Sequence, residues 1–243
     1  MQRLTEFLWR RLNAWMSAQQ LVATPAAKHD GSADDLVTAM FRRPGQKFLH
    51  VGCGHTRKAL AGPGFQSEVW TEIRLDIDPA VEPDIVGTIL DMSAVPTESM
   101  DAVFSSHTLE HLYAHEVPDA LGEMRRVLKP NGFMVSRVPD LQSAARMIAE
   151  DRLFDTAYMS PAGPIAPFDI LYSYRGFVGR DRPYMAHHGG FTLTTLIAAC
   201  KAAGFASVVG KRWESGFELW VLATKTPIPE GELKRLAAEH FPE

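Results

Sequence analysis

The chain of 243 residues contains little cysteine: Cys53 and Cys200 are its two, and they stand alone in the sequence. Without a Cys-x-x-Cys pair, a zinc ribbon and a redox dithiol are disfavoured, and isolated reduced thiols are typical of a cytoplasmic protein. An excess of basic residues is also missing, because 25 Lys and Arg face 29 Asp and Glu. Nucleic acid is therefore not an expected partner, since its binding usually needs a basic face.

Long apolar runs are absent as well, so no transmembrane span is expected. Arg10 and Arg11 interrupt the apolar part of the N-terminus, and a secretory signal peptide is not predicted there. Hydrophobic residues make up 46% and charged residues 22%, which is an ordinary globular balance. The length suits one sizeable α/β core with additions.

An amphipathic helix is predicted at the N-terminus, where apolar residues recur at helical spacing. Three interpretations besides packing on the domain stay open: a lid over the active site, a homodimer contact and a membrane-surface helix. A second short helix is expected over 34–42. Residues 1–44 are therefore interpreted as an N-terminal helical extension. The apolar positions of the first helix are Leu4, Phe7, Leu8, Leu12, Trp15 and Met16.

From residue 47 onward, strand-like segments alternate with helical ones. This alternation predicts an α/β, Rossmann-like, mostly parallel seven-stranded sheet with helices on both faces and an antiparallel C-terminal edge. The domain is expected over 45–226, with a substrate-binding insertion at 141–190 and a C-terminal helix at 227–243. Expected strands are 47–52, 69–76, 84–90, 102–106 and 133–138, then a hairpin of 206–213 and 217–224. Expected helices are 118–128, 141–150 and 193–203, with a turn at 129–132.

Two close glycines follow the first predicted strand, and an acid ends the second. Gly52 and Gly54 let the backbone approach a ligand without an intervening Cβ, and Asp76 can accept hydrogen bonds from ribose hydroxyls. The dinucleotide fingerprint requires a third glycine where Arg57 stands, so pyrophosphate binding is disfavoured. A Walker lysine is missing too. The pattern indicates a nucleotide-like cofactor that is not a dinucleotide.

Five segments in order make the domain resemble the class I S-adenosylmethionine-dependent methyltransferases, and within them the type 11-like group. Each segment alone is common, but their order and spacing together are specific. The resemblance implies a Rossmann-like fold, S-adenosyl-L-methionine as cofactor and transferase activity. The segments are Val51–Gly54, Asp76–Pro79, Asp91–Met92 with the following Val95-Pro96 and 99–101, Ser105–Leu112, and Arg126–Gly132 followed by 138–140.

The resemblance implies a role for each matching residue. The loop Val51–Gly54 would pass under the methionine part of the cofactor, Asp76 with Ile77 would meet the ribose, and Asp91 would accept from the adenine amino group. Met92 would pack beside the ring, and Ser105 would contact the cofactor. Asp76 and Asp91 are also compatible with turn or helix-cap roles. The family pattern is broken at His50, where an acid is common, and at Thr56, where a glycine is common.

His107 is the leading candidate for a general base, because it follows the fourth strand beside the expected methyl group. His188 is a second catalytic candidate, and both residues are also compatible with purely structural roles. The stretch His107–His111 matches the H-x-x-E-H pattern of inverzincin metalloproteases. Since the same letters belong to the methyltransferase pattern, we interpret them as part of it and predict no metal ligands.

The insertion is expected to bind the methyl acceptor through Tyr172, Tyr174, Arg175 and His187. Aromatic rings offer a stacking wall, and arginine can bind a carboxylate or phosphate. The predicted acceptor is a small polar or anionic metabolite or glycan. Closing the core under the insertion is the alternative role of these aromatics. A non-catalytic S-adenosylmethionine-binding regulatory or interaction protein is the alternative function.

Overall fold

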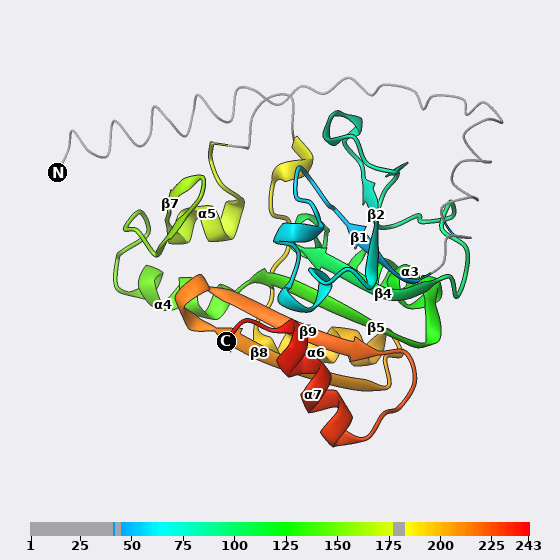
Figure 1. The fold of residues 1–243 in the computed structure, drawn as a ribbon. Helices are drawn as coiled ribbons and strands as arrows, with labels where there is room; N and C mark the ends of the chain where they lie inside the picture. Colours follow the sequence, from blue (N-terminus) through cyan, green and yellow to red (C-terminus); the bar gives the residue numbers. More distant parts are fainter. Residues whose placement is uncertain (1–40, 42–44, 177–182) are drawn as a thin grey trace.

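The computed structural model describes residue 41 and residues 45–176 and 183–243. A seven-stranded sheet forms its centre, in the order β3-β2-β1-β4-β5-β9-β8 (Figure 1). Strands β1 (Gln46–Val51), β2 (Trp70–Asp76), β3 (Ile85–Val86), β4 (Met100–Ser106) and β5 (Leu128–Pro139) are parallel to their neighbours. Strand β9 (Glu218–Thr224) runs antiparallel between β5 and β8 (Ser207–Trp213). The predicted fold class is confirmed.

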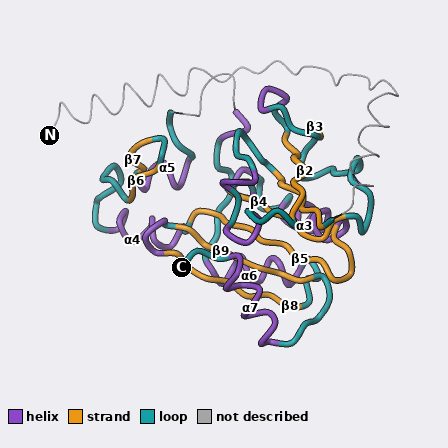
Figure 2. Tube along the Cα trace, in the orientation of Figure 1, coloured by secondary structure: helices purple, strands orange, loops and turns teal. Residues whose placement is uncertain are grey.

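Both faces of the sheet are buried, because apolar residues point to alternate sides along each strand. Leu49 and Val51 pack into the core beneath α3 (Val117–Val127) and α6 (Leu193–Ala202). Phe48 points to the other side and packs with Phe65 in the second core cluster. That opposite core is covered by η2 (Pro63–Phe65) and α7 (Glu230–His240), so the molecule has three layers (Figure 2).

Two local predictions are wrong. The third strand is two residues long, Ile85–Val86, instead of 84–90. The segment 129–132, predicted as a turn, belongs to β5. Pairing of β5 with β4 passes from Leu128 opposite Met100 to Phe133 opposite Ala102. The extra residues therefore form a bulge, and turn-forming residues are tolerated within the strand. Between β1 and β2 the chain forms two short 3-10 turns, η1 (Lys58–Leu60) and η2.

The insertion after β5 contains more regular structure than its sequence indicates. It begins with α4 (Leu141–Ala149), continues with a hairpin of β6 (Tyr158–Ser160) and β7 (Gly163–Ile165), and adds α5 (Pro167–Tyr172). A small core of its own holds Ala144, Ile165 and Ile170. The turn η5 (Pro183–Met185) then leads back to the sheet. The predicted helices over 4–17 and 34–42 lie outside the described residues except for residue 41.

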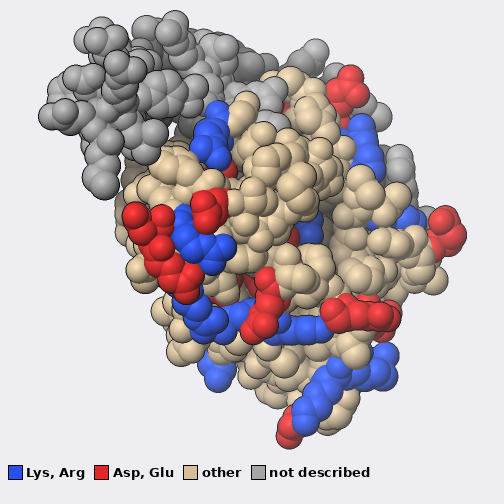
Figure 3. All heavy atoms as spheres, turned by 90° about the vertical axis from the view of Figure 1, so that its left-hand side faces the viewer, with Lys and Arg blue, Asp and Glu red and all other residues tan. Residues whose placement is uncertain are grey.

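Acidic and basic side chains lie next to each other on the face shown in Figure 3. Exposed ion pairs include Arg152 with Glu150 at 3.1 Å and with Asp155 at 3.0 Å. Among the described residues, no helix is long and apolar enough to cross a membrane.

His240, at the end of α7, is buried in an aromatic cluster. Its ring centroid lies 4.5 Å from that of Phe65 and 4.9 Å from that of Phe133. The side chain is 1% exposed, and its Nδ1 has no hydrogen-bond partner among the described residues. Burial lowers the pKa of His240 from 6.5 to about 4, because the charged imidazolium loses its hydration.

We expect the free energy of unfolding to fall by about 3 kcal/mol through His240 as the pH drops from 6.5 to 4. In this range the unfolded chain binds a proton that the folded chain does not, so acid favours unfolding. Urea denaturation at several pH values measures the slope. His240→Phe removes the titrating group and is expected to flatten this part of the profile. An unchanged profile in that variant would contradict the assignment.

Candidate cofactor and acceptor site

The glycine loop leaves the carboxyl end of β1 in a left-handed conformation. Gly52 has φ +62° and Gly54 has φ +50°, a region that side chains with a Cβ rarely adopt. A Cβ on Gly52 would lie 2.4 Å from Thr108 Oγ1, in the loop after β4, whereas a Cβ on Gly54 would meet no described atom within 4 Å. The loop is therefore packed against the β4 loop at Gly52 and open at Gly54.

Three charged side chains on one face of β2 hold this loop. Glu72 accepts the backbone N–H of Lys58 at 2.9 Å, and Asp76 accepts that of Gly54 at 2.7 Å. Arg74 is 3% exposed and donates to the carbonyls of Gly54, Val81 and Glu82. Sequence reasoning missed Glu72 and Arg74. These charged residues alternate with Ile73 and Leu75 in a strand that is buried on both faces. That alternation could have indicated that one face of the strand carries buried polar contacts.

His50, which replaces the acid common in the family, is paired with a carboxylate from the next strand. Its Nδ1 lies 2.7 Å from Glu72 Oε1, and the imidazole is 1% exposed. Since Glu72 also holds the Lys58 N–H, the carboxylate that fixes the loop comes from β2. Although residue 50 is a histidine, a largely buried acid, Glu72, therefore still lies near the glycine loop.

Asp76 is a buried carboxylate beside the glycine loop. Its side chain ends β2, and its two oxygens accept the N–H groups of Gly54 and Asp78. Each carboxylate oxygen keeps a further lone pair for a ligand hydroxyl. The neighbouring Ile77 is 54% exposed, which leaves an apolar surface beside the acid. Tyr184 from the insertion donates to Asp78 Oδ2 at 2.9 Å, so the insertion reaches this loop.

Asp91 and Met92 follow β3 and differ in exposure. Met92 is 1% exposed, while Asp91 is exposed and its Oδ1 accepts the Ser93 N–H at 3.0 Å. Hydrogen bonds from Ser93, with the charge of Arg126, hold the pKa of Asp91 below its usual value. A hollow of about 710 Å³ beside Asp91 is lined by α3 residues, and neither Gly52 nor Asp76 lines it. Asp91 thus caps the turn at Ser93, and its contact with a cofactor stays a prediction.

Cys53 and Ser105 are both buried. Burial raises the pKa of the Cys53 thiol to about 12, and Asp76 and Glu72 add to this against the opposing charge of Arg74. The thiol therefore stays protonated, and a role of Cys53 in cofactor binding stays a prediction. The Ser105 side chain is 0% exposed, and its hydroxyl has no hydrogen-bond partner within the described ranges. Its contact with the cofactor stays a prediction.

His107 lies between two carboxylates. Its φ is +52°, its Nε2 is 3.0 Å from Glu218 Oε1, and its Nδ1 is 3.3 Å from Glu110 Oε1. Burial lowers the pKa of His107, but hydrogen bonds and charges from Glu110 and Glu218 outweigh it and raise the pKa to about 9. The imidazolium form has no lone pair to accept a proton. The surroundings thus oppose the predicted base role. Glu218 was missed because it comes from β9.

Two of the predicted acceptor-binding residues, Tyr174 and Arg175, contact other residues of the insertion. Arg175 Nη2 lies 3.0 Å from Asp169 Oδ2, and its guanidinium lies over the ring of Phe168 at 5.9 Å. Tyr174 donates to the Ala162 carbonyl at 3.1 Å. Tyr172 is 56% exposed. These contacts fit the structural alternative for Arg175 and Tyr174, whose binding roles stay predictions.

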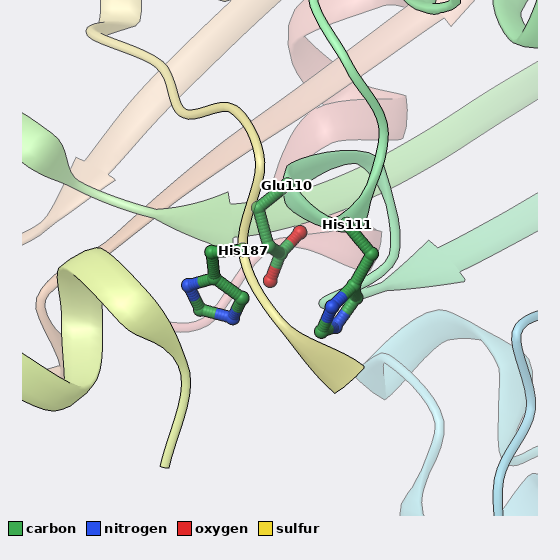
Figure 4. Close-up of side chains that lie close together, drawn as sticks. All are labelled: Glu110, His111 and His187. Carbon is green, nitrogen blue, oxygen red and sulfur yellow. The ribbon is translucent and has the colours of Figure 1, made fainter. Parts of the chain in front are cut away.

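The two consecutive histidines after the insertion point to different places. His188 is exposed, and its ring stacks on Tyr113 with centroids 4.3 Å apart. His187 lies beside Glu110 and His111 (Figure 4). Burial, helped by the charge of His111, lowers the pKa of His187 against the opposing effect of Glu110. The structure therefore places His187 next to Glu110 and His111 and leaves His188 on the surface.

The H-x-x-E-H stretch does not form the helix that an inverzincin would need. It includes the short turn η4 (Leu109–His111), and the left-handed backbone at His107 precedes that turn. His107 and His111 consequently do not share a helical face.

Two comparisons relate part of this chain to methyltransferases. Residues 49–136 match the family described as "Methyltransferase domain". A stretch of 52 residues is 46% identical to the Aspergillus luteorubrus protein named "Probable methyltransferase ltbC", and it spans 21% of this chain and 18% of that protein.

Two solved structures illustrate the structural similarity. The Burkholderia thailandensis 1,6-didemethyltoxoflavin-N1-methyltransferase, with S-adenosylhomocysteine bound, is 15% identical with a TM-score of 0.46, over 81% of this chain and 78% of that one. The Haemonchus contortus phosphoethanolamine N-methyltransferase 2, with S-adenosyl-L-methionine bound, is 12% identical with a TM-score of 0.46, over 81% of this chain and 53% of that one.

The family match covers the glycine loop, Asp76, Asp91 and the loop after β4. The glycine loop, Asp76 and the β4 loop follow the carboxyl ends of parallel strands, and the match over residues 49–136 to the methyltransferase domain family is consistent with a class I S-adenosylmethionine-dependent methyltransferase.

Proposed function

We propose that the chain transfers a methyl group from S-adenosyl-L-methionine to a small polar or anionic acceptor. The observation that carries the proposal is the arrangement around Asp76: a buried carboxylate that retains acceptor capacity, an exposed Ile77 beside it, and an open backbone cradle at Gly54. These features match the hydroxyls, the apolar ring and the close backbone approach of a nucleoside.

When bound, the cofactor supplies an activated methyl group on a sulfonium, and the transfer is an in-line displacement at carbon. The chain's own contribution is to align the acceptor and exclude water. In this proposal Val51–Gly54 carries the methionine part, Asp76 holds the ribose, and Asp91 and Met92 meet the adenine. His107 is not assigned as a base, because both of its ring nitrogens face carboxylates. The acceptor lies toward the insertion, which already contacts the Asp78 loop through Tyr184.

We expect Asp76→Ala to weaken S-adenosylhomocysteine binding by about 2–4 kcal/mol, roughly 30- to 1000-fold, because hydrogen bonds to a charged acceptor are lost. Isothermal titration calorimetry measures the loss. Asp101→Ala is the matched control. Asp101 also accepts a backbone N–H, that of Lys47 at 2.9 Å, but at the opposite end of the parallel strands. Equal weakening in both variants, or no binding by the wild type at millimolar ligand, would contradict the cofactor site.

Turnover separates the enzyme from the non-catalytic alternative. The purified chain is incubated with S-adenosyl-L-methionine and a panel of anionic and polar metabolites and glycans, and formation of S-adenosylhomocysteine is measured. Acceptor-dependent formation that Asp76→Ala abolishes supports the proposal. Tight binding of S-adenosylhomocysteine with no acceptor-dependent turnover across the panel would favour a binding protein.

A further inference from the structure

Three side chains with metal-binding atoms converge beside the β4 loop. Glu110 and His111 belong to η4, and His187 follows η5 at the end of the insertion. One potential ligand atom from each lies within 4.8 Å of the others, and Figure 4 shows the carboxylate between the two imidazoles. The cluster joins two segments that are far apart in the sequence, and the methyl-transfer proposal uses none of its three members.

In both imidazoles Nδ1 contacts a backbone carbonyl. His111 Nδ1 lies 3.1 Å from the Ala186 carbonyl, and His187 Nδ1 lies 2.9 Å from the Ile170 carbonyl. A carbonyl only accepts hydrogen bonds, so each Nδ1 carries the proton and each Nε2 keeps its lone pair. Metal-binding histidines are oriented in this way, with the other ring nitrogen donating to a carbonyl or carboxylate.

The surroundings of Glu110 independently indicate that a cation binds there. Its side chain is 1% exposed, and Oε1 forms an ion pair with His107 Nδ1 at 3.3 Å, which His107 shares with Glu218. That pair leaves Oε2 without a hydrogen-bond partner in the described part of the chain. A buried carboxylate oxygen without a hydrogen bond is costly. A cation that accepts electron pairs from Glu110 would remove that cost.

The backbone fixes the cluster from the side of the insertion. The N–H groups of His188 and Gly189 donate to the Glu110 carbonyl at 2.9 and 3.0 Å. A Cβ on Gly189 would lie 2.9 Å from the Leu112 carbonyl, so glycine permits this close approach. The two segments are thus held together by main-chain contacts, independently of any ligand.

We propose that Glu110, His111 and His187 bind one divalent first-row transition ion such as Zn²⁺ or Fe²⁺. Two imidazoles and one carboxylate suit these ions and leave coordination positions open for water or another oxygen ligand. With metal–ligand bonds of about 2.1 Å, tetrahedral ligand atoms lie about 3.4 Å apart. The present limit of 4.8 Å therefore needs a closure of about 1.4 Å at most, within reach of side-chain rotation.

The test uses the full chain, stripped with EDTA and dialysed. Zn²⁺ is titrated by calorimetry, and Co²⁺ binding is followed by its visible absorption bands. We expect one equivalent of metal, and affinity reduced more than about 100-fold in Glu110→Gln and His187→Ala, because each loses a direct ligand. His188→Ala and His115→Ala are the matched controls, since both are exposed and stack near Tyr113 instead; both are expected to bind metal like the wild type.

Melting curves without metal show whether each variant is folded, and a rise in Tm on adding Zn²⁺ to the wild type gives a readout that needs no variant. No binding by the wild type, or equal binding by wild type and the His111→Ala, His187→Ala double variant, would overturn the proposal. Loss of binding in His188→Ala alone would overturn the ligand set. The S-adenosylhomocysteine titration is run in parallel, so failure of the metal site is distinguishable from failure of the methyltransferase proposal.

Discussion

Gly52→Ala is expected to abolish measurable S-adenosylhomocysteine binding and to lower the free energy of unfolding by about 2–5 kcal/mol. About 1–2 kcal/mol comes from placing alanine at φ +62°. A further 1–3 kcal/mol or so comes from overpacking, because the new Cβ would lie 2.4 Å from Thr108 Oγ1 and 2.7 Å from Thr108 Cγ2. Either the glycine loop or the β4 loop has to move, and both border the proposed cofactor position. Urea denaturation and calorimetry measure the two effects.

Gly54→Ala is the control for the backbone contribution. It has a similar φ of +50°, but its Cβ would meet no described atom within 4 Å, so a loss of about 1–2 kcal/mol is expected. Thr108→Ala removes the two closest atoms and is expected to restore part of the stability of Gly52→Ala in a double-mutant cycle. If Gly52→Ala and Gly54→Ala are equally stable, the packing of the two loops is not as described.

Arg74→Met is expected to lower the free energy of unfolding by about 3 kcal/mol or more and to weaken S-adenosylhomocysteine binding. The guanidinium is 3% exposed and donates to three carbonyls, of Gly54, Val81 and Glu82. Methionine fills the space but leaves those acceptors without a donor, at about 1–3 kcal/mol each before relaxation. Gly54 belongs to the loop after β1, and Val81 belongs to the loop after β2. The substitution therefore removes the hydrogen bonds that Arg74 donates to both loops at the proposed ribose position.

Arg125→Met is the control for this variant. Arg125, on α3, is partly exposed and donates to a single carbonyl, that of Gly204, in a solvent-exposed hydrogen bond, so a change within about 0.5 kcal/mol is expected. Thermal and urea unfolding compare the two. If both variants lose a similar amount of unfolding free energy, the hydrogen bonds from Arg74 to the two loops are not the cause of the expected destabilisation.

Local patterns were sufficient for the central part of the fold. Apolar segments ending in Gly52 and Asp76 predicted parallel strands whose carboxyl ends meet, and β1 pairs with β2 in parallel register. Helices with clear apolar periodicity, such as α4 and α6, were placed within one residue at each end. The bulge at 129–132 was mistaken for a turn, because proline and glycine punctuate both kinds of structure.

Roles that depend on partners from other segments could not be read from the sequence. His107 looks like a base beside a strand, but Glu110 and Glu218 favour its proton-bound form. Arg175 looks like an anion-binding residue, but Asp169 already pairs with it. Glu218 comes close to His107 only because β9 pairs with β5. Glu110 and Asp169 are near their partners in the sequence, but the local backbone conformation, such as the left-handed φ at His107, decides that they pair.

The sequence by itself determined the class of the domain, the parallel strands and the strand ends that carry Gly52 and Asp76, because these depend on periodicity and on residues at strand ends. Only the tertiary structure decided which histidine meets Glu110, what holds the glycine loop in place of an acid at residue 50, and the proton affinity of His107. Those properties depend on burial and on distances between side chains from separate segments, which folding alone brings together.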